Sequence, residues 1–278
     1  MAQEFAGRLR RQALLPRVLT VFVGVPVVLA LLWLGGAWWL ILAAVILVLG
    51  AMEYASLRAL TQRNEIVLRL ASLLMFVLIA VGPEMLGRWL LAAWALVIFT
   101  LGLIPMVLTG VMPPAGGEAQ ASSVILGIAY LATPFAVLVR WRLDLGPQSV
   151  LAFLIVIWAN DIAAYFVGLA VGRHKLAPRV SPGKSWEGAA GGLAGGLIAG
   201  LLLFSFLGPT RGAAAVWAVI VTIVSQGADL FESILKRRAG VKDSGRLLPG
   251  HGGVLDRFDG ILLACPAGYV LLRLFGGR

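Results

Sequence analysis

Long apolar runs recur along nearly the whole chain and constrain its fold more than any other feature. A helix of about 20 apolar residues crosses a bilayer core of about 30 Å. Nine runs of roughly this length are present, at residues 18–35, 37–57, 66–82, 88–109, 123–142, 149–172, 188–208, 213–235 and 259–275. We therefore predict an all-α fold, a polytopic integral membrane helical bundle with about nine transmembrane helices.

Composition excludes the other fold classes. Hydrophobic residues make up 60% of the 278 residues and charged residues 13%, against about 45–50% and about 25% in an ordinary soluble domain. A disordered chain would instead have low hydrophobicity and high charge. We expect one membrane domain over residues 1–278. Its N-terminal helical part, 1–150, holds few polar residues inside runs, with Glu53 the main exception, and its C-terminal part, 151–278, carries the candidate catalytic residues.

The positive charges lie mostly on one side of such a bundle. The net charge is +10, and most Lys and Arg residues fall in the N-terminus and the even-numbered loops, chiefly 173–187 and 236–258. The positive-inside rule then places the N-terminus in the cytoplasm. Nucleic-acid binding is not expected, because the charge is divided among short loops. The single cysteine, Cys265, permits no intramolecular disulfide and is expected to be a small buried residue.

Acidic residues within the apolar runs are the first functional signal. Asp161, Asp229 and Glu232 each lie inside a predicted membrane helix. An ionised side chain at membrane depth costs at least about 2.5–3.5 kcal/mol, so such residues usually face an aqueous cavity and a cation. A helix–helix hydrogen bond is the alternative for Asp161.

Cations, acids and glycines are concentrated between Ser233 and Asp259. Glycines let backbone amides approach an anion closely, and Lys and Arg hold phosphate by charge. Asp256 and Asp259 are three residues apart and would share a face at a helix start. Together with Asp229, they suit a hard cation such as Mg²⁺. A solvated positive loop explains the cations but leaves the acids and the glycine-rich turn unexplained.

The loop at 173–187 is a second candidate anion site. Its Ser181-Pro-Gly-Lys184-Ser185 order favours a polyphosphate binder, although it does not match the P-loop pattern. His251 is expected to contact phosphate or to stabilise a turn. Gly188, Gly192, Gly196 and Gly200 recur every four residues, which predicts a face for close helix packing.

The region 155–260 resembles a known family. The sequence from Ser233 through Lys236-Arg237 and Lys242-Asp243 to LPGHGGVLDRFD at 248–259 is similar to the signature of phosphatidate cytidylyltransferases, or CDP-diacylglycerol synthases. The upstream segments NDIAAYFVG, GRHKLAPRVSPGKSWEG and ADLFES resemble that family in the same order.

This resemblance implies a reaction and roles for individual residues. CTP and phosphatidate would give CDP-diacylglycerol and pyrophosphate, with Mg²⁺ as cofactor and a second cation left open. The implied metal ligands are Asp229, Asp256 and Asp259, with Asp161 and Glu232 as auxiliary groups. The implied catalytic residues are Asp161, Asp229, Asp256, Asp259 and Lys242, the last of which would hold phosphate. The implied substrate-binding residues are Ser181, Lys184, Ser185, Ser233, Lys236, Arg237, His251 and Arg257.

The resemblance also implies partners and a location. We expect CTP and a membrane lipid as partners, no nucleic acid, and a multi-pass protein of a bacterial-type inner membrane with cytoplasmic active-site loops. A homodimer is left open. A CTP-dependent lipid kinase and a cation-coupled transporter are the competing functions.

Overall fold

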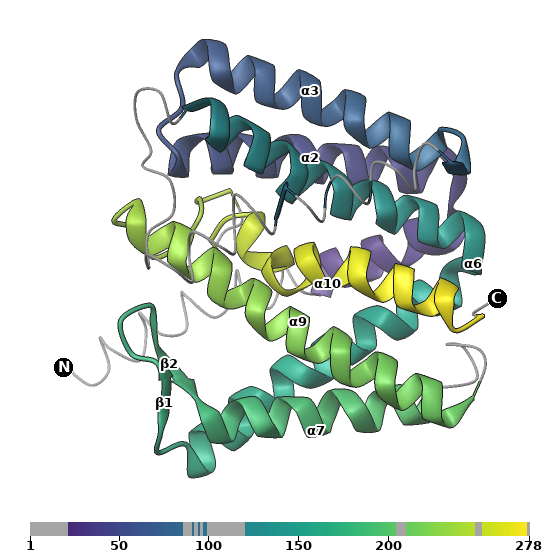
Figure 1. The fold of residues 1–278 in the computed structure, drawn as a ribbon, viewed down its shortest axis with the longest axis vertical. Helices are drawn as coiled ribbons and strands as arrows, with labels where there is room; N and C mark the ends of the chain where they lie inside the picture. Colours follow the sequence, from purple (N-terminus) through teal and green to yellow (C-terminus); the bar gives the residue numbers. More distant parts are fainter. Residues whose placement is uncertain are drawn as a thin grey trace.

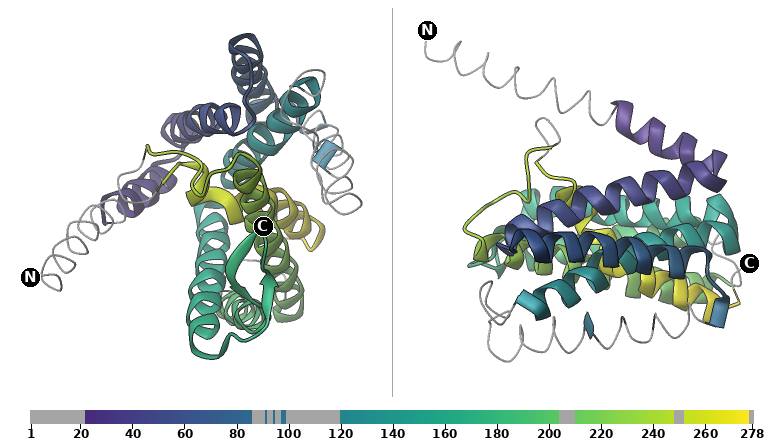
Figure 2. Two further views of the ribbon diagram at one scale, coloured as in Figure 1. Left: turned by 90° about the vertical axis from the view of Figure 1, so that its left-hand side faces the viewer. Right: turned by 90° about the horizontal axis from the view of Figure 1, so that it is seen from above.

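Helices dominate the computed structural model, which describes residues 22–85, 91, 94, 97–98, 120–203, 210–247 and 252–276. A short apolar helix, Phe22–Leu34, comes first. The other elements are α2 (Gly36–Leu57), α3 (Gln62–Val81), α6 (Gln120–Val171), β1 (Lys175–Ala177), β2 (Ser181–Ser185), α7 (Trp186–Leu202), α9 (Arg211–Arg238) and α10 (Leu255–Leu274). The helices lie side by side in one elongated bundle (Figures 1 and 2).

The predicted helical membrane bundle is confirmed, but the number of nine spans is not. Among the described residues, α2, α3, α6 and α9 are long and apolar enough to cross a membrane. Helix α7 has only 17 residues, and α10 carries charged residues near both ends. The predicted run 88–109 lies almost entirely outside the described residues.

Helix α6 contains two of the predicted runs. Its 52 residues include one non-helical position, Gly146, with φ 78° and ψ 167°. The left-handed φ favours glycine, and Pro147 follows at the first position of the second half, where a missing N–H costs nothing. Figure 1 shows α6 crossing the bundle and returning. The predicted boundary at residue 150 therefore falls inside the second half of α6.

The glycine face of α7 packs as the sequence predicts. Gly188, Gly192, Gly196 and Gly200 are all buried. A Cβ on Gly192 would lie 2.5 Å from the side chain of Asn160 on α6, and one on Gly196 would overlap the Thr222 hydroxyl on α9. The absence of side chains thus allows α7 to contact both neighbouring helices closely.

The segment 173–187, expected as a loop, contains a β-hairpin. Strands β1 and β2 are antiparallel, with Lys175 opposite Ser185 and Ala177 opposite Ser181. The turn is closed by a hydrogen bond from Val180 N–H to Ala177 O. Pro178 occupies the second position of this turn, where its fixed φ is favoured. The hairpin projects from one end of the bundle (Figure 1).

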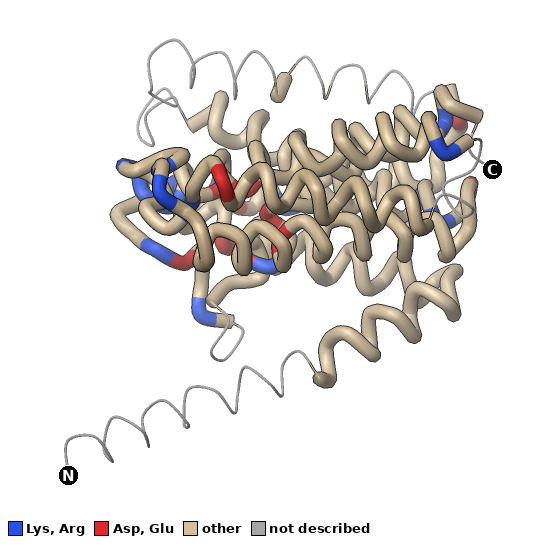
Figure 3. The backbone as a smooth tube through the Cα atoms, turned by 90° about the horizontal axis from the view of Figure 1, so that it is seen from below, with Lys and Arg blue, Asp and Glu red and all other residues tan. Residues whose placement is uncertain are grey.

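Charged residues gather at that same end. Figure 3 shows most Lys and Arg at one end of the bundle, with acidic residues just inside it, and fewer charges at the opposite end. The core between the ends is apolar and aromatic, with Trp141, Phe153 and Trp217 fully buried and packed against one another. The described chain therefore has a polar end on an apolar bundle, as in a membrane protein with its site near one surface.

Candidate active site

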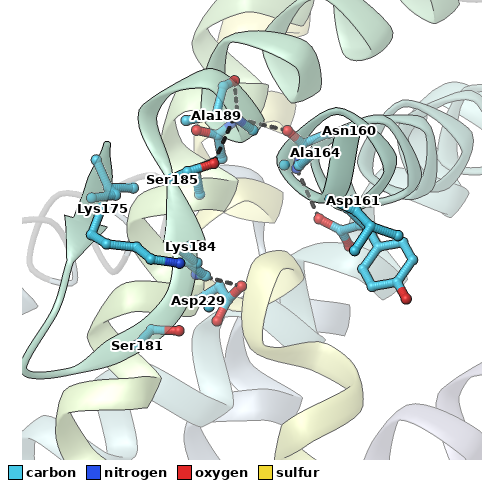
Figure 4. Close-up of a pocket in the computed structure, with 16 residues that line it drawn as sticks. Asn160, Asp161, Ala164, Lys175, Ser181, Lys184, Ser185, Ala189 and Asp229 are labelled. Atoms are coloured by element: carbon cyan, nitrogen blue, oxygen red, sulfur yellow. Dashed lines mark hydrogen bonds and ion pairs between the residues drawn. The ribbon is translucent and has the colours of Figure 1, made fainter. Parts of the chain in front are cut away.

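A cavity of about 540 Å³ opens where the hairpin meets the bundle (Figure 4). The end of the second half of α6, both strands, the start of α7 and the middle of α9 line it. This volume lies within the range of small-molecule sites, about 300–1,000 Å³. Five predicted site residues line the cavity: Asp161, Ser181, Lys184, Ser185 and Asp229.

Hydrogen bonds around Glu187 hold the hairpin against α7. The Glu187 carboxylate accepts the backbone N–H groups of Arg173 and His174 and lies 2.6 Å from His174 Nδ1. The hydrogen bond with His174 lowers the pKa of Glu187 to about 2. Ser185 caps α7 by accepting the N–H of Gly188 at 3.1 Å. These contacts fix the strand that carries Ser181 and Lys184.

Lys184 and Asp229 form the central ion pair of the cavity. Lys184 Nζ lies 2.6 Å from Asp229 Oδ2, and the two side chains are 26% and 35% exposed. The pair joins β2 to α9, and Figure 4 shows it inside the cavity. Lys175, from β1, adds a second cation to the lining. A polyanion entering the cavity would therefore meet two ammonium groups.

Three carboxylates share the region around this pair. Asp161 on α6 and Asp229 on α9 both line the cavity, and their negative charges repel that of Asp259 on α10. Asp161 accepts a hydrogen bond from the Asn160 amide at 2.8 Å. Gln226 donates both to Asn160 Oδ1 and to the carbonyl of Ala189. This amide network fixes the cavity wall between α6, α7 and α9.

Asp256 lies in a second, more buried cluster. Its Oδ1 is 2.7 Å from Lys236 Nζ, and Lys236 also lies 3.2 Å from Glu232 Oε1. Its Oδ2 accepts the backbone N–H groups of Ser244 and Gly253, both at 2.8 Å. Both carboxylate oxygens therefore already bind protein groups, and Lys236 is bound between two acids.

The remaining predicted residues that the structure describes lie around this end of the bundle. Arg237 donates to the carbonyls of Val180 and Val241, which ties α9 to the hairpin turn. Ser233 Oγ is 3.5 Å from Asp229 Oδ1. Lys242 and Arg257 are exposed. His251 lies outside the described residues, as does the preceding Leu-Pro-Gly segment.

A divalent cation fits part of the predicted ligand set. Within the described part of the chain, no group of three or more His, Cys, Asp and Glu side chains is arranged as a preformed metal cluster. Asp229 and Asp259 nevertheless supply hard oxygen ligands, with one oxygen of each engaged, Asp229 Oδ2 by Lys184 at 2.6 Å and Asp259 Oδ1 by the N–H of Gly260 at 2.7 Å. Mg²⁺ usually binds one or two carboxylates plus substrate phosphates. These two residues fit Mg²⁺ by chemistry, whereas the oxygens of Asp256 hold Lys236 and the backbone.

Four functional residues were not assigned from the sequence. Asn160 and Gln226 brace the cavity, Ser244 contacts Asp256, and Glu53 binds the start of α10. Only Glu53 gave a signal in the sequence, as an acid at the end of an apolar run. The amides and the serine gave none, because the Asn160–Gln226 and Ser244–Asp256 contacts join residues 66 and 12 positions apart.

Comparisons with known proteins identify the family. The family described as the cytidylyltransferase family matches residues 15–275. A phosphatidate cytidylyltransferase of Pseudomonas aeruginosa is 40% identical over 270 residues, which cover 94% of this chain and 97% of that protein. One from Brucella suis is 48% identical over 140 residues, half of each chain. One from Mycobacterium leprae is 40% identical over 158 residues, which cover 56% of this chain and 50% of that protein.

The bundle and its cavity define a helical membrane enzyme whose acidic and basic residues meet at one end. The chain belongs to the cytidylyltransferase family. The resemblance inferred for 155–260 is thereby confirmed. It extends through most of the N-terminal half, where the sequence showed only apolar helices.

Proposed function

We propose that this protein transfers the cytidylyl group of CTP to phosphatidate, giving CDP-diacylglycerol and pyrophosphate. The relatives from Pseudomonas, Brucella and Mycobacterium are named for this activity. The observation that carries the proposal is the cavity itself, in which Lys175 and Lys184 lie with Asp161 and Asp229 at the charged end of an apolar bundle. Such a site can receive a soluble nucleotide while the acyl chains stay in lipid.

The chemistry requires two anions to meet. A phosphate oxygen of phosphatidate attacks the α-phosphorus of CTP, a new P–O bond forms, and the bond to the leaving pyrophosphate breaks. Catalysis of such a step is mostly positioning and charge stabilisation. Lys175 and Lys184 would bind phosphate oxygens, and Ser181 and Ser185 would donate hydroxyl hydrogen bonds to the nucleotide or the lipid headgroup.

Mg²⁺ is the proposed cofactor, held by Asp229 and Asp259 with Asp161 nearby. When bound, it would neutralise the charge that builds up between the two phosphates. A second cation stays an open part of the proposal. Asp256 stays a predicted ligand from the sequence, although its contacts favour a role in holding the loop that precedes α10.

The proposed location is a bacterial-type inner membrane with the N-terminus and the hairpin in the cytoplasm. The gathering of Lys and Arg at the hairpin end supports this orientation. A homodimer and the absence of nucleic-acid binding remain predictions.

Product analysis tests the reaction. Purified protein in detergent receives phosphatidate, Mg²⁺ and CTP labelled at the α-phosphate. We expect a labelled CDP-lipid together with pyrophosphate, and loss of both with a chelator or in Asp259→Asn. In a parallel reaction with a polyprenol or phytol in place of phosphatidate, a phosphorylated lipid with free CDP would instead identify a lipid kinase. No product from folded protein would overturn the proposal.

A further inference from the structure

Glu53 connects the N-terminal half of the chain to the start of α10. It lies near the end of α2 and is only 8% exposed. Its two carboxylate oxygens accept the backbone N–H groups of Val254 at 2.8 Å and Leu255 at 2.9 Å. Ser244 Oγ lies 2.9 Å from the same carboxylate. The two backbone partners are 201 and 202 positions away in the sequence.

The start of α10 needs this acceptor. The first N–H groups of a helix have no acceptor within the helix, and the residue at the N-cap position, Val254, makes no side-chain capping bond. Glu53 supplies the missing acceptor from another helix. Its negative charge also interacts favourably with the positive end of the helix dipole. The presence of Glu53 in an apolar run is thus explained, because the fold places its carboxylate beside the N-terminus of α10.

The loop before α10 is shaped to approach this carboxylate. A Cβ on Gly253 would lie 2.5 Å from Glu53 Oε2, and one on Gly245 would overlap the other oxygen. Gly252, beside them, has φ 81°, a conformation that favours glycine. The glycines of this segment therefore let its backbone close around Glu53, in addition to any contact with phosphate.

The position of α10 matters for the proposed site. Its first turn carries Asp256, and the next turn carries Asp259, on which the charge of Asp229 acts. We propose that Glu53 is a positioning residue of the active site, which fixes the first turn of α10 and with it the position of Asp259 in the next turn. This inference rests on the proposed cytidylyl transfer only for its kinetic test.

Two measurements on Glu53→Gln test the proposal. Glutamine keeps the size of the side chain, but only one of its two terminal atoms accepts a hydrogen bond, so one N–H of the pair loses its acceptor. We expect faster hydrogen exchange in the segment 252–258. We also expect kcat to fall on the order of ten- to a hundredfold, with KM for CTP nearly unchanged, because small misplacements near reacting groups cost this much.

Glu84→Gln is the matched control. Glu84 is 58% exposed and pairs with Arg273 away from the cavity, so neither measurement should change. Unchanged exchange in Glu53→Gln would overturn the capping role. Faster exchange with an unchanged kcat per folded molecule would overturn the positioning role and leave a structural one.

Folding and function are kept separate in this design. If Glu53→Gln does not fold, Ser244→Ala removes the hydroxyl that contacts both Glu53 and Asp256, and a smaller change in both measurements is expected; no change would count against the proposal. A folded wild-type protein without cytidylyl transfer would refute the proposed function. The exchange measurement would still decide whether Glu53 holds this turn.

Discussion

Replacing Asp256 with asparagine distinguishes two roles for this residue. The sequence pattern predicts a metal ligand, whereas the structure surrounds the carboxylate with Lys236 and with the backbone N–H groups of Ser244 and Gly253. Asparagine keeps the volume but removes the charge, and its NH₂ group cannot accept a hydrogen bond. If the structural contacts dominate, the substitution destabilises the fold.

The magnitude follows from the buried ion pair. Removing one charge of such a pair costs about 3–5 kcal/mol when the other is left unpaired. Lys236 keeps a second contact, to Glu232 at 3.2 Å, so we expect the lower end, about 3 kcal/mol. At about 2–4 °C per kcal/mol for large chains, this lowers Tm by about 6–12 °C.

Thermal unfolding in detergent, followed by tryptophan fluorescence with and without Mg²⁺, measures this shift. Asp243→Asn is the matched control, because Asp243 is an exposed carboxylate of the same loop, and its Tm should match that of the wild type. The reasoning is refuted if Asp256→Asn keeps the wild-type Tm without Mg²⁺ and loses only a Mg²⁺-dependent increase. That outcome would make Asp256 the metal ligand that the sequence predicts.

Three further predictions concern the hairpin and the glycine face. Lys184→Met removes a cavity cation. Steady-state kinetics should show KM for CTP raised about tenfold, which corresponds to the loss of one charge-assisted hydrogen bond. An unchanged KM would exclude Lys184 from nucleotide binding. The pKa of Glu187 is lowered to about 2 by His174, so its stabilisation of the hairpin is complete above its ordinary value of 4.5 and is lost as the pH falls from there towards 2. The protection factors of the amides at 173–174 against hydrogen exchange should fall over that interval, and protection without this transition would contradict the assignment. Gly196→Val should destabilise the bundle by about 1–3 kcal/mol through overpacking. Gly227→Ala is the control and should not, because a Cβ at Gly227 would have no atom within 4 Å. Equal melting temperatures of the two variants would contradict the packing account.

The helices and the glycine face could be predicted because their signals are local. An apolar run specifies a membrane helix by its length alone, and the four-residue repeat from Gly188 to Gly200 places small residues on one face. The predicted runs 18–35 and 37–57 are separated at residue 36, and the structure has positive φ at both Gly35 and Gly36. The gathering of cations at one end also follows from summing charges over loops.

The hairpin and the details of the site could not be predicted in this way. Strands β1 and β2 have three and five residues and no apolar alternation, so only their pairing identifies them. The spacing of Asp256 and Asp259 correctly places both in the first turns of α10. It does not reveal that the carboxylate oxygens of Asp256 bind Lys236 and the loop backbone. The role of Glu53 depends on α2 lying beside α10, which no pattern within either segment encodes.

The rate of CDP-lipid formation by Asp229→Asn, set beside that of the wild type in the same detergent, tests the central claim most directly. Asp229 pairs with Lys184 in the cavity, and its charge also acts on Asp259. If this cavity is the site of cytidylyl transfer, kcat should fall on the order of a hundred- to a thousandfold, as when a group that stabilises the transition state is removed, while the protein stays folded. A folded variant that forms CDP-lipid at the wild-type rate would place the reaction elsewhere and contradict the account.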